Sequence, residues 1–358
     1  AAAAAKAAAL ALFRGHRPRV VTVDLPRGGQ ATVPISKLTV RRKACACTVR
    51  KEGSEKGDVT AGMLLVATVI KSEAPGIRVD GGKGVGLVTR PGLDVPVGER
   101  AINPIPRHMI ASGVSQALGD YGKGRGCRVV ISVPEGRQIA TRTLNGRLGI
   151  AGGISILGTT GIQVPYSTRA FLDSIGLSLR VARHSADLVV LSTGRHSEDS
   201  ARRYLDLPEE LFVLCGDHVG WAIRKCVKSG FDKVLLWSMP AKMAKLAEGK
   251  RNLNWRRGLP DVAWLASMAV GKTAMGKPAV FDTVHGLLEA MEPHERRRVL
   301  SLVCRLASIS CEDLARGSLR VFTAVVNRQG FLEAAWPPWP WPVSSRALPG
   351  CIPGITSR

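Results

Sequence analysis

Residues 187–237 decide the fold class, because they contain three short apolar runs, Asp187-Leu-Val-Val-Leu-Ser192, Leu211-Phe-Val-Leu-Cys215 and Lys233-Val-Leu-Leu-Trp237. Each run has the length and composition of a buried strand, and each is followed by a segment with the apolar spacing of a helix. Alternating strands and helices are typical of a parallel sheet with crossover helices. Residues 168–334 are therefore predicted to form an α/β domain with a mainly parallel sheet, the smaller of two domains.

Residues 1–167 follow a different pattern and are predicted to form an α+β domain. Short β-rich runs alternate with glycine turns, at Val20–Leu25, Ala46–Lys51, Leu64–Lys71, Leu87–Thr89 and Arg128–Val133. A helix is expected after Asn103, since Asn is a favourable N-cap and Pro104 suits a first turn. The alanine-rich start of the chain is expected to be a second helix. Residues 335–358, which begin with a Trp- and Pro-rich run, are predicted to be a disordered tail.

The composition points to a partner of negative charge. The 358 residues include 51 Lys plus Arg and 28 Asp plus Glu, so the formal net charge is 51 − 28 = +23. Nucleic acid, an anionic membrane and an acidic small molecule all fit this sign. The longest mostly apolar run, Val59–Ile70, has about 12 residues and is too short to cross a bilayer. The 8 cysteines contain no Cys-X-X-Cys pair, which disfavours structural zinc and favours reduced thiols in a cytoplasmic protein.

Three glycine-rich segments are candidates for ligand binding. In residues 80–93, clustered glycines that include Gly84 and Gly86 surround Lys83, an arrangement that favours an anion but equally fits a strained turn. In residues 101–110, Arg107 lies in the first turn of the expected helix. A cation is unfavourable at the N-terminal, positive end of a helix dipole. Either a carboxylate partner or simple solvation would explain Arg107 at this position. Residues 145–167 lie where the two predicted domains join, a common place for a cleft. The candidates there are Gly152, Gly153, Ser155, Gly158, Thr159 and Thr160.

In this order and spacing, the three segments resemble the cobalt-precorrin-5B C1-methyltransferase family (CbiD-type) of anaerobic cobalamin biosynthesis. The similar motifs are Gly84-Val-Gly-Leu-Val-Thr-Arg-Pro-Gly-Leu93, Gly98–Ile110 and Leu148–Ser167, and Asp58-Val-Thr-Ala-Gly62 matches the end of an earlier one. The resemblance extends from the start of the chain to about residue 334. It implies methyl transfer from S-adenosylmethionine, as co-substrate, to carbon 1 of a corrin precursor. Cobalt enters only as part of that substrate, and no protein-bound metal is expected.

The implied reaction is a displacement at a sulfonium methyl, which depends on alignment and exclusion of water more than on a catalytic dyad. No catalytic residue is therefore predicted. The substrate carries several carboxylates, for which Lys83, Arg90 and Arg107 are candidate partners. The remaining predicted binding residues come from the matched motifs and from one helix face: Asp58, Thr60, Thr89, Asn103, Lys242 and Lys245.

The sequence departs from the family pattern at three places. Met239 and Asn254 stand where the family has histidines, and Lys56 stands in a run that is usually acidic. If those histidines move protons, methionine does not replace them; if they orient loops, Asn254 suffices. A degenerate homologue that binds the corrinoid without turnover is therefore one alternative. A basic nucleic-acid-binding protein is the other, although Tyr and Phe are scarce for such a protein. Neither nucleic acid nor a membrane is the expected partner.

Overall fold

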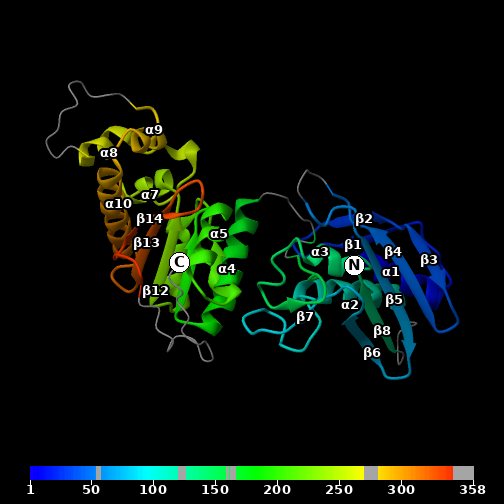
Figure 1. The fold of residues 1–358 in the computed structure, drawn as a ribbon. Helices are drawn as coiled ribbons and strands as arrows, with labels where there is room; N and C mark the ends of the chain where they lie inside the picture. The colour runs from blue at the N-terminus through cyan, green and yellow to red at the C-terminus, as the bar shows by residue number, and fades with distance from the viewer. Residues whose placement is uncertain (54–57, 120–125, 159–160, 162–166, 270–280, 342–358) are drawn as a thin grey trace. The chain divides into compact units, whose positions relative to one another are not determined.

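The protein is described here by a computed structural model that covers residues 1–53, 58–119, 126–158, 161, 167–269 and 281–341. The chain divides into two compact units, an N-terminal unit of Ala1–Ser167 and a C-terminal unit of Thr168–Arg358 (Figure 1). An α+β unit is followed by a unit with a mainly parallel sheet, which confirms the predicted fold class. The second unit is not the smaller one, contrary to expectation, because its C-terminal part continues the fold past residue 334.

The N-terminal unit is built around a mixed five-stranded sheet. Its helices are α1 (Ala2–Arg14), α2 (Pro104–Leu118) and α3 (Gly136–Ala140). Its strands are β1 (Val20–Asp24), β2 (Gln30–Pro34), β3 (Lys37–Val40), β4 (Ala44–Arg50), β5 (Leu64–Ser72), β6 (Gly76–Gly81), β7 (Leu87–Val88), β8 (Gly126–Ser132) and β9 (Ile150–Ala151). The sheet has the order β3-β4-β5-β8-β6 and is antiparallel except for the β6–β8 pair. Two short antiparallel ribbons, β1–β2 and β7–β9, complete the unit.

The alanine-rich start of the chain forms the predicted helix, α1, and this helix is part of the N-terminal core. Almost every side chain from Ala2 to Ala9 is buried. Because alanine is small, α1 packs closely against α2 and against strands β4 and β5. Gly113 on α2 faces α1, and a Cβ atom there would lie at an ordinary contact distance of 3.5 Å from the Ala2 carbonyl oxygen.

The C-terminal unit is built around a five-stranded sheet in the order β11-β10-β12-β13-β14. Its strands are β10 (Leu188–Ser192), β11 (Phe212–Leu214), β12 (Lys233–Ser238), β13 (Arg320–Val326) and β14 (Leu332–Trp336). Its helices are α4 (Thr168–Ser185), α5 (Arg195–Tyr204), η2 (Glu209–Leu211), α6 (Val219–Ser229), α7 (Pro240–Ala247), η3 (Trp255–Arg257), α8 (Val262–Ala269), α9 (Val284–Glu289) and α10 (Pro293–Leu314). All strand pairs are parallel except β13–β14.

Helices cover this sheet on both faces, which explains the continuous apolar runs of its strands. All five residues of β10 are buried, as expected for a parallel strand between two layers. Right-handed crossovers place α5 and α6 on opposite faces, because the chain moves in opposite directions across the sheet at these two connections. The helix α6 packs against α4 and α10, whereas α5 contacts β10, β11 and β12.

The prediction of a disordered tail is wrong for residues 335–341. Residues 342–358 lie outside the described part of the chain. Strand β14 runs to Trp336, and Trp341 is only 1% exposed. The Trp341 ring lies 6.1 Å from that of Trp237 and 5.5 Å from that of Phe322. The prolines prevent a helix in this segment, but the tryptophans still bury apolar area against the sheet, and that burial folds it.

Candidate functional site

The carboxyl edge of the C-terminal sheet, between β10 and β12, has the geometry of a ligand site. From β10 the chain forms β11 on one side and then crosses back to form β12 on the other side. Open α/β sheets bind ligands where the strand order reverses in this way. Two helices also begin at this edge, α5 after Gly194 and α7 after Met239.

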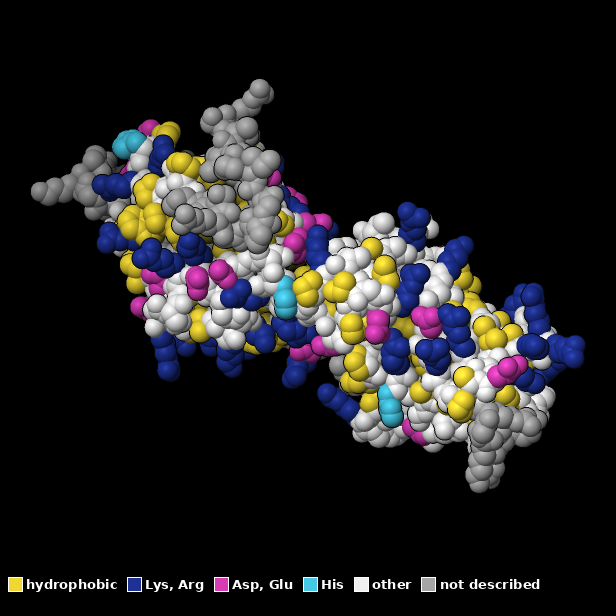
Figure 2. Space-filling model, turned by 90° about the horizontal axis from the view of Figure 1, so that it is seen from below, with side chains coloured by type: hydrophobic (Ala, Val, Ile, Leu, Met, Phe, Trp, Pro, Cys, Tyr) yellow, Lys and Arg dark blue, Asp and Glu magenta, His cyan; other side chains and the backbone are white. Residues whose placement is uncertain are grey.

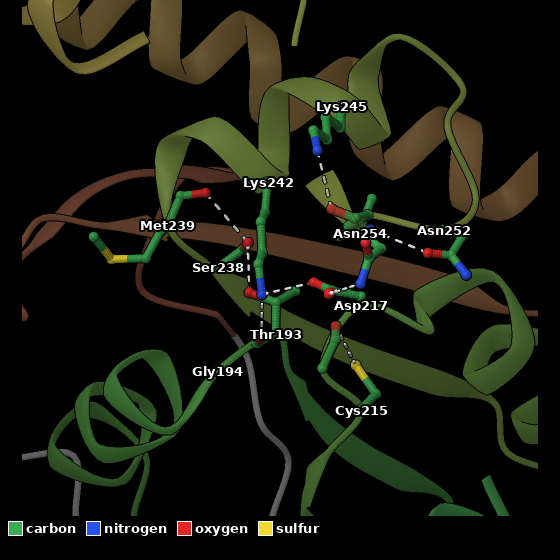
Figure 3. Close-up of polar contacts among 12 residues, drawn as sticks. Thr193, Gly194, Cys215, Asp217, Ser238, Met239, Lys242, Lys245, Asn252 and Asn254 are labelled. Atoms are coloured by element: carbon green, nitrogen blue, oxygen red, sulfur yellow. Dashed lines mark hydrogen bonds and ion pairs between the residues drawn. The ribbon is translucent and has the colours of Figure 1, made fainter. Parts of the chain in front are cut away.

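A buried polar network joins the ends of these two strands (Figure 3). The hydroxyl groups of Thr193 and Ser238 lie 2.8 Å apart and are fully screened from solvent. The Lys242 ammonium donates to the Thr193 carbonyl oxygen at 2.7 Å and forms an ion pair with Asp217 at 2.9 Å. Since Thr193 follows β10, Asp217 follows β11 and Lys242 follows β12, one ammonium group holds three strand ends together.

Lys245, the second lysine predicted to bind a ligand, does not share the partners of Lys242. It is only 4% exposed, and its Nζ donates to the Leu253 carbonyl oxygen at 3.0 Å. Burial removes water from this ammonium and lowers its pKa, although the nearby Asp217 carboxylate opposes that shift. Lys242 and Lys245 therefore lie in one region, as predicted, but each is already engaged by the protein itself.

The two positions at which the family pattern has histidines, Met239 and Asn254, have separate surroundings. Asn254 donates to the Asp217 carboxylate at 3.3 Å, and its own side-chain oxygen accepts from the Arg256 backbone N–H. Met239 is the N-cap of α7, and its side chain points away from the Lys242–Asp217 pair in Figure 3. Asn254 thus belongs to the network by hydrogen bonding, whereas Met239 contributes its backbone carbonyl, which accepts from Ser238 at 3.2 Å.

In the N-terminal unit, the predicted glycines pack backbone against backbone. Gly84 has a left-handed φ of 76°, and a Cβ atom there would lie 1.8 Å from the Val133 carbonyl oxygen. A Cβ on Gly153 would lie 2.3 Å from the Gly84 carbonyl oxygen, and one on Gly86 would lie 2.9 Å from the Gly153 carbonyl oxygen. These three glycines are needed for close packing whether or not a ligand binds.

Other glycines of the third motif border open space. Gly152 and Gly158 both have positive φ, and no heavy atom lies within 4 Å of where a Cβ would be. Between these two, the Ser155 hydroxyl lies 3.4 Å from the buried Asn145, whose amide donates to the Gly153 carbonyl oxygen. Thr159 and Thr160 lie outside the described residues. Among the described residues of this motif, Gly152 and Gly158 therefore leave their backbone beside open space.

The predicted basic residues of the N-terminal unit differ in whether the protein itself already engages their side chains. Lys83 is exposed on its turn. Arg90 donates to the Arg147 carbonyl oxygen at 3.4 Å, and the neighbouring Thr89 hydroxyl donates to the Gly149 carbonyl oxygen. Arg107 has a carboxylate partner, as the sequence suggests, but this partner belongs to the protein and not to a ligand. Glu99 lies 3.3 Å away, and the Val79 carbonyl oxygen accepts a second hydrogen bond from Arg107.

Asp58 and Thr60 form a closed turn with Lys51. The Asp58 carboxylate accepts from the Thr60 backbone and hydroxyl groups and forms a 2.6 Å ion pair with Lys51. Partial burial disfavours its charge, but the bonds from Lys51 and Thr60 outweigh burial and lower the pKa of Asp58. Asn103, which the sequence predicts as a cap, uses its backbone N–H on the Ile156 carbonyl oxygen and makes no side-chain cap.

A surface hollow of about 520 Å³ lies where β1 meets the first turns of α2. Its lining includes Leu25, Ile105, His108 and Met109. A Cβ on Gly161 would approach Leu25 to 2.8 Å, so the third glycine motif passes beside this hollow. The hollow combines apolar side chains with the polar groups of Asp24, His108, Ser112 and Gln116, none of which the sequence predicts as binding residues.

Among the residues that the structure describes, no three His, Cys, Asp or Glu side chains are grouped as a metal site would require. No described helix combines the length and apolar character needed to cross a membrane. The described cysteines are all buried, and burial raises the pKa of Cys215 to about 12. A thiol with such a pKa is a poor nucleophile at neutral pH.

Sequence reasoning missed Thr193, Asp217 and Ser238. Their signal is position: each lies at or just after the carboxyl end of a predicted strand, where α/β sheets gather their functional groups. The link between Asp217 and Asn254 joins residues far apart in sequence, so only the fold reveals it.

Known proteins match the chain over most of its length. The cobalt-precorrin-5B C(1)-methyltransferase of Geobacillus sp. (strain WCH70) is 41% identical over 338 residues, which are 92% of this chain and 92% of that protein. The protein of the same name from Moorella thermoacetica is 38% identical over 92% of this chain and 91% of its own. A crystal structure of a cobalamin biosynthesis protein (cbiD) from Archaeoglobus fulgidus is 27% identical and covers 71% of this chain and 80% of its own, with a TM-score of 0.36.

The CbiD family model matches residues 1–165. This range contains the first two glycine segments that carry the resemblance and the third up to residue 165. Together with identity near 40% across almost the whole of both chains, the match shows that the protein belongs to the cobalt-precorrin-5B C(1)-methyltransferase family.

Proposed function

We propose that the protein transfers a methyl group from S-adenosylmethionine to carbon 1 of cobalt-precorrin-5B and so forms cobalt-precorrin-6A in anaerobic cobalamin biosynthesis. The observation that carries the proposal is the 41% identity, over 92% of both chains, to a protein of that activity. The proposed substrate is a polycarboxylate, and its charge complements the excess of basic residues in this chain.

The proposed reaction needs positioning more than acid–base catalysis. An electron pair of the ring carbon forms the new bond to the methyl group, and the sulfur–methyl bond breaks with its electron pair left on sulfur. Because the leaving group is then a neutral thioether, no proton has to be delivered to it. A protein that aligns the two reactants and excludes water supplies the main part of the acceleration.

We infer that the methyl donor binds at the carboxyl edge between β10 and β12. The backbone turns at Thr193–Gly194 and Met239–Pro240 lie at this edge. Lys242 and Asp217 are bonded to each other and to Thr193 and Asn254, so their proposed role is to fix the two turns. Turns that are already fixed by hydrogen bonds and an ion pair need little rearrangement when a ligand binds.

For the N-terminal unit taken by itself, we propose that Lys83, Arg90 and the backbone at Gly152 and Gly158 bind anionic groups of a ligand. Lys83 is exposed, and both glycines border open space. The remaining predicted residues are assigned to the frame of this site, because the structure gives each of them an internal partner or a packing role: Asp58, Thr60, Gly84, Gly86, Thr89, Asn103, Arg107, Gly153 and Ser155.

Nucleic-acid binding is the less favoured alternative. On the face shown in Figure 2, Lys and Arg side chains are spread over each unit and interleaved with acidic ones instead of forming one continuous stripe. In the basic run at residues 296–298, the charge of Arg296 is compensated by Glu333, and Arg298 is engaged by the Ala269 carbonyl oxygen. A nucleic-acid site normally concentrates its cations along one groove.

The test is to incubate the protein under anaerobic conditions with cobalt-precorrin-5B and methyl-labelled S-adenosylmethionine. We expect label in the corrin ring and an equal amount of S-adenosylhomocysteine. Binding of both ligands without transfer of label would support a degenerate homologue, in which Met239 and Asn254 have replaced necessary histidines. Absence of binding to either ligand would refute the proposal.

A further inference from the structure

The segment Asn252–Leu259, which we call the Trp255 loop, carries an unusual pair of exposed side chains. Trp255 is 67% exposed and Leu259 is 68% exposed, the two highest values among the large apolar side chains that the structure describes. A single exposed leucine is ordinary on a protein surface. An exposed tryptophan that lies close in sequence to a second exposed apolar side chain is a frequent mark of a binding surface.

The exposure is not the result of a loosely held loop. Leu253 is buried, its N–H donates to the Asp217 carbonyl oxygen at 2.8 Å, and its carbonyl accepts from Lys245. At the other end, Lys250 donates to the Leu259 carbonyl oxygen at 2.7 Å. Between these two anchors, Asn254 caps the turn η3 that contains Trp255. The backbone on both sides of Trp255 is therefore anchored by hydrogen bonds.

The Trp255 loop also rims the site described above. Its anchor Asp217 follows β11 at the carboxyl edge of the sheet and is the ion-pair partner of Lys242. Asn254, which precedes Trp255, bonds to the same carboxylate (Figure 3). A ligand that lies on Trp255 is therefore next to the edge at which we place the methyl donor.

The charges on the loop specify the ligand further. Arg256 and Arg257 are both exposed, and the Arg256 guanidinium carbon lies 5.4 Å from the centre of the Trp255 ring. Indole and guanidinium groups together provide a flat apolar platform with cations at its border. Such a surface complements a broad, flat, apolar ring system with carboxylates on its periphery.

We propose that the Trp255 loop is the docking surface for the corrinoid, with Trp255 and Leu259 against the macrocycle and Arg256 and Arg257 on its carboxylates. This inference rests on the proposed function, which names a corrinoid as substrate. It also goes beyond the resemblance, which rests on the glycine segments and names no residue of 255–259 as a binding residue. Single-stranded nucleic acid stacks on aromatic residues too, but it uses a row of them, and this loop offers one.

The experiment measures binding separately from catalysis. Cobyrinic acid, a corrinoid with free peripheral carboxylates, and its methyl ester are titrated calorimetrically into the full chain and its variants. Trp255→Ala should weaken cobyrinic acid binding about tenfold, and Trp255→Phe should restore most of it. The double variant Arg256→Gln/Arg257→Gln should weaken binding of the acid but not of the ester, and should reduce the salt dependence.

Matched controls lie at the opposite edge of the same sheet or on a distant helix surface. Ile309→Ala on α10 removes an exposed apolar group, and Arg320→Gln at the start of β13 removes an exposed cation. Both should bind cobyrinic acid as the original protein does. Circular dichroism and the unfolding midpoint verify that each variant is folded.

The outcomes separate this inference from the proposed function. If Trp255→Ala changes neither the Kd for cobyrinic acid nor the KM for cobalt-precorrin-5B while methyl transfer proceeds, the docking surface is refuted and the function stands. If binding depends on Trp255 but no methyl is transferred, the function fails and the docking surface stands. If the original protein binds neither corrinoid, or if Trp255→Ala weakens only the binding of a thymidine oligonucleotide, the docking surface is also refuted.

Discussion

Replacing Gly84 with alanine tests whether the glycines of the first glycine motif serve packing. Gly84 has a φ of 76°, and its new Cβ would lie 1.8 Å from the Val133 carbonyl oxygen. The left-handed backbone costs a non-glycine residue about 1–2 kcal/mol, and the forced shift of packed backbone costs about 1–3 kcal/mol more. Gly152→Ala is the matched control, since Gly152 has a φ of 74° but no heavy atom within 4 Å of a Cβ. The difference between the two variants isolates the clash, about 2 kcal/mol.

The assay uses the distribution of tryptophan in the chain. All 7 tryptophans lie in the C-terminal unit, so their fluorescence follows that unit, while far-ultraviolet circular dichroism follows both. Gly84→Ala should lower the unfolding midpoint of the N-terminal unit by about 4–8 °C more than Gly152→Ala does. The fluorescence transition should stay in place. Equal midpoints for the two variants, or a shift confined to the fluorescence signal, would refute the packing role.

Three further predictions concern charge and packing. Lys242→Met leaves Asp217 without its cation, and because both side chains are partly exposed, the free energy of unfolding should fall by only about 1 kcal/mol. The rate of methyl transfer should nevertheless fall about tenfold or more. A loss of stability with an unchanged rate of methyl transfer would contradict the positioning role. The pKa of Asp58 is lower in the folded protein than its ordinary value of 3.8, so the stabilisation by its carboxylate is complete above that value and is lost as the pH falls through the folded pKa. Asp58→Asn should therefore flatten the pH dependence of the free energy of unfolding only in that acid range. Urea titrations from pH 2 to 7 measure this. Trp341→Ala should cost the C-terminal unit about 3–5 kcal/mol in urea unfolding followed by fluorescence, and a loss below about 1 kcal/mol would mean that the segment after β14 does not contribute to the core.

The sequence was sufficient to predict the architecture where local pattern and burial agree. The strands around Leu188, Phe212 and Val234 were found because parallel strands covered on both faces need uninterrupted apolar residues. The segment that contains Trp341 was misjudged, because its prolines and tryptophans have the composition of a disordered tail. Whether such a segment folds depends on an apolar surface elsewhere in the chain, and no local pattern reveals that surface.

The candidate site was predicted less completely, for a related reason. A glycine required by close backbone packing, such as Gly84, and a glycine beside open space, such as Gly152, look alike in sequence. Likewise, Lys242 was expected to be a binding residue, but its partner Asp217 comes from another strand end and appears only in the folded sheet. Motifs identify the family, whereas the division between frame and ligand contact requires the coordinates.

The two-ended anchoring of the Trp255 loop has a consequence for altering this protein. Leu253 and Leu259 are held through their backbone carbonyl groups, so their hydrogen bonds to Lys245 and Lys250 do not depend on which side chains lie between them. The side chains of residues 255–257 can therefore be randomised without disturbing the ends of β10, β11 and β12. A library at these three positions, selected for binding of differently amidated corrinoids, would change selectivity while the polar network at Thr193, Asp217 and Lys242 stays as it is.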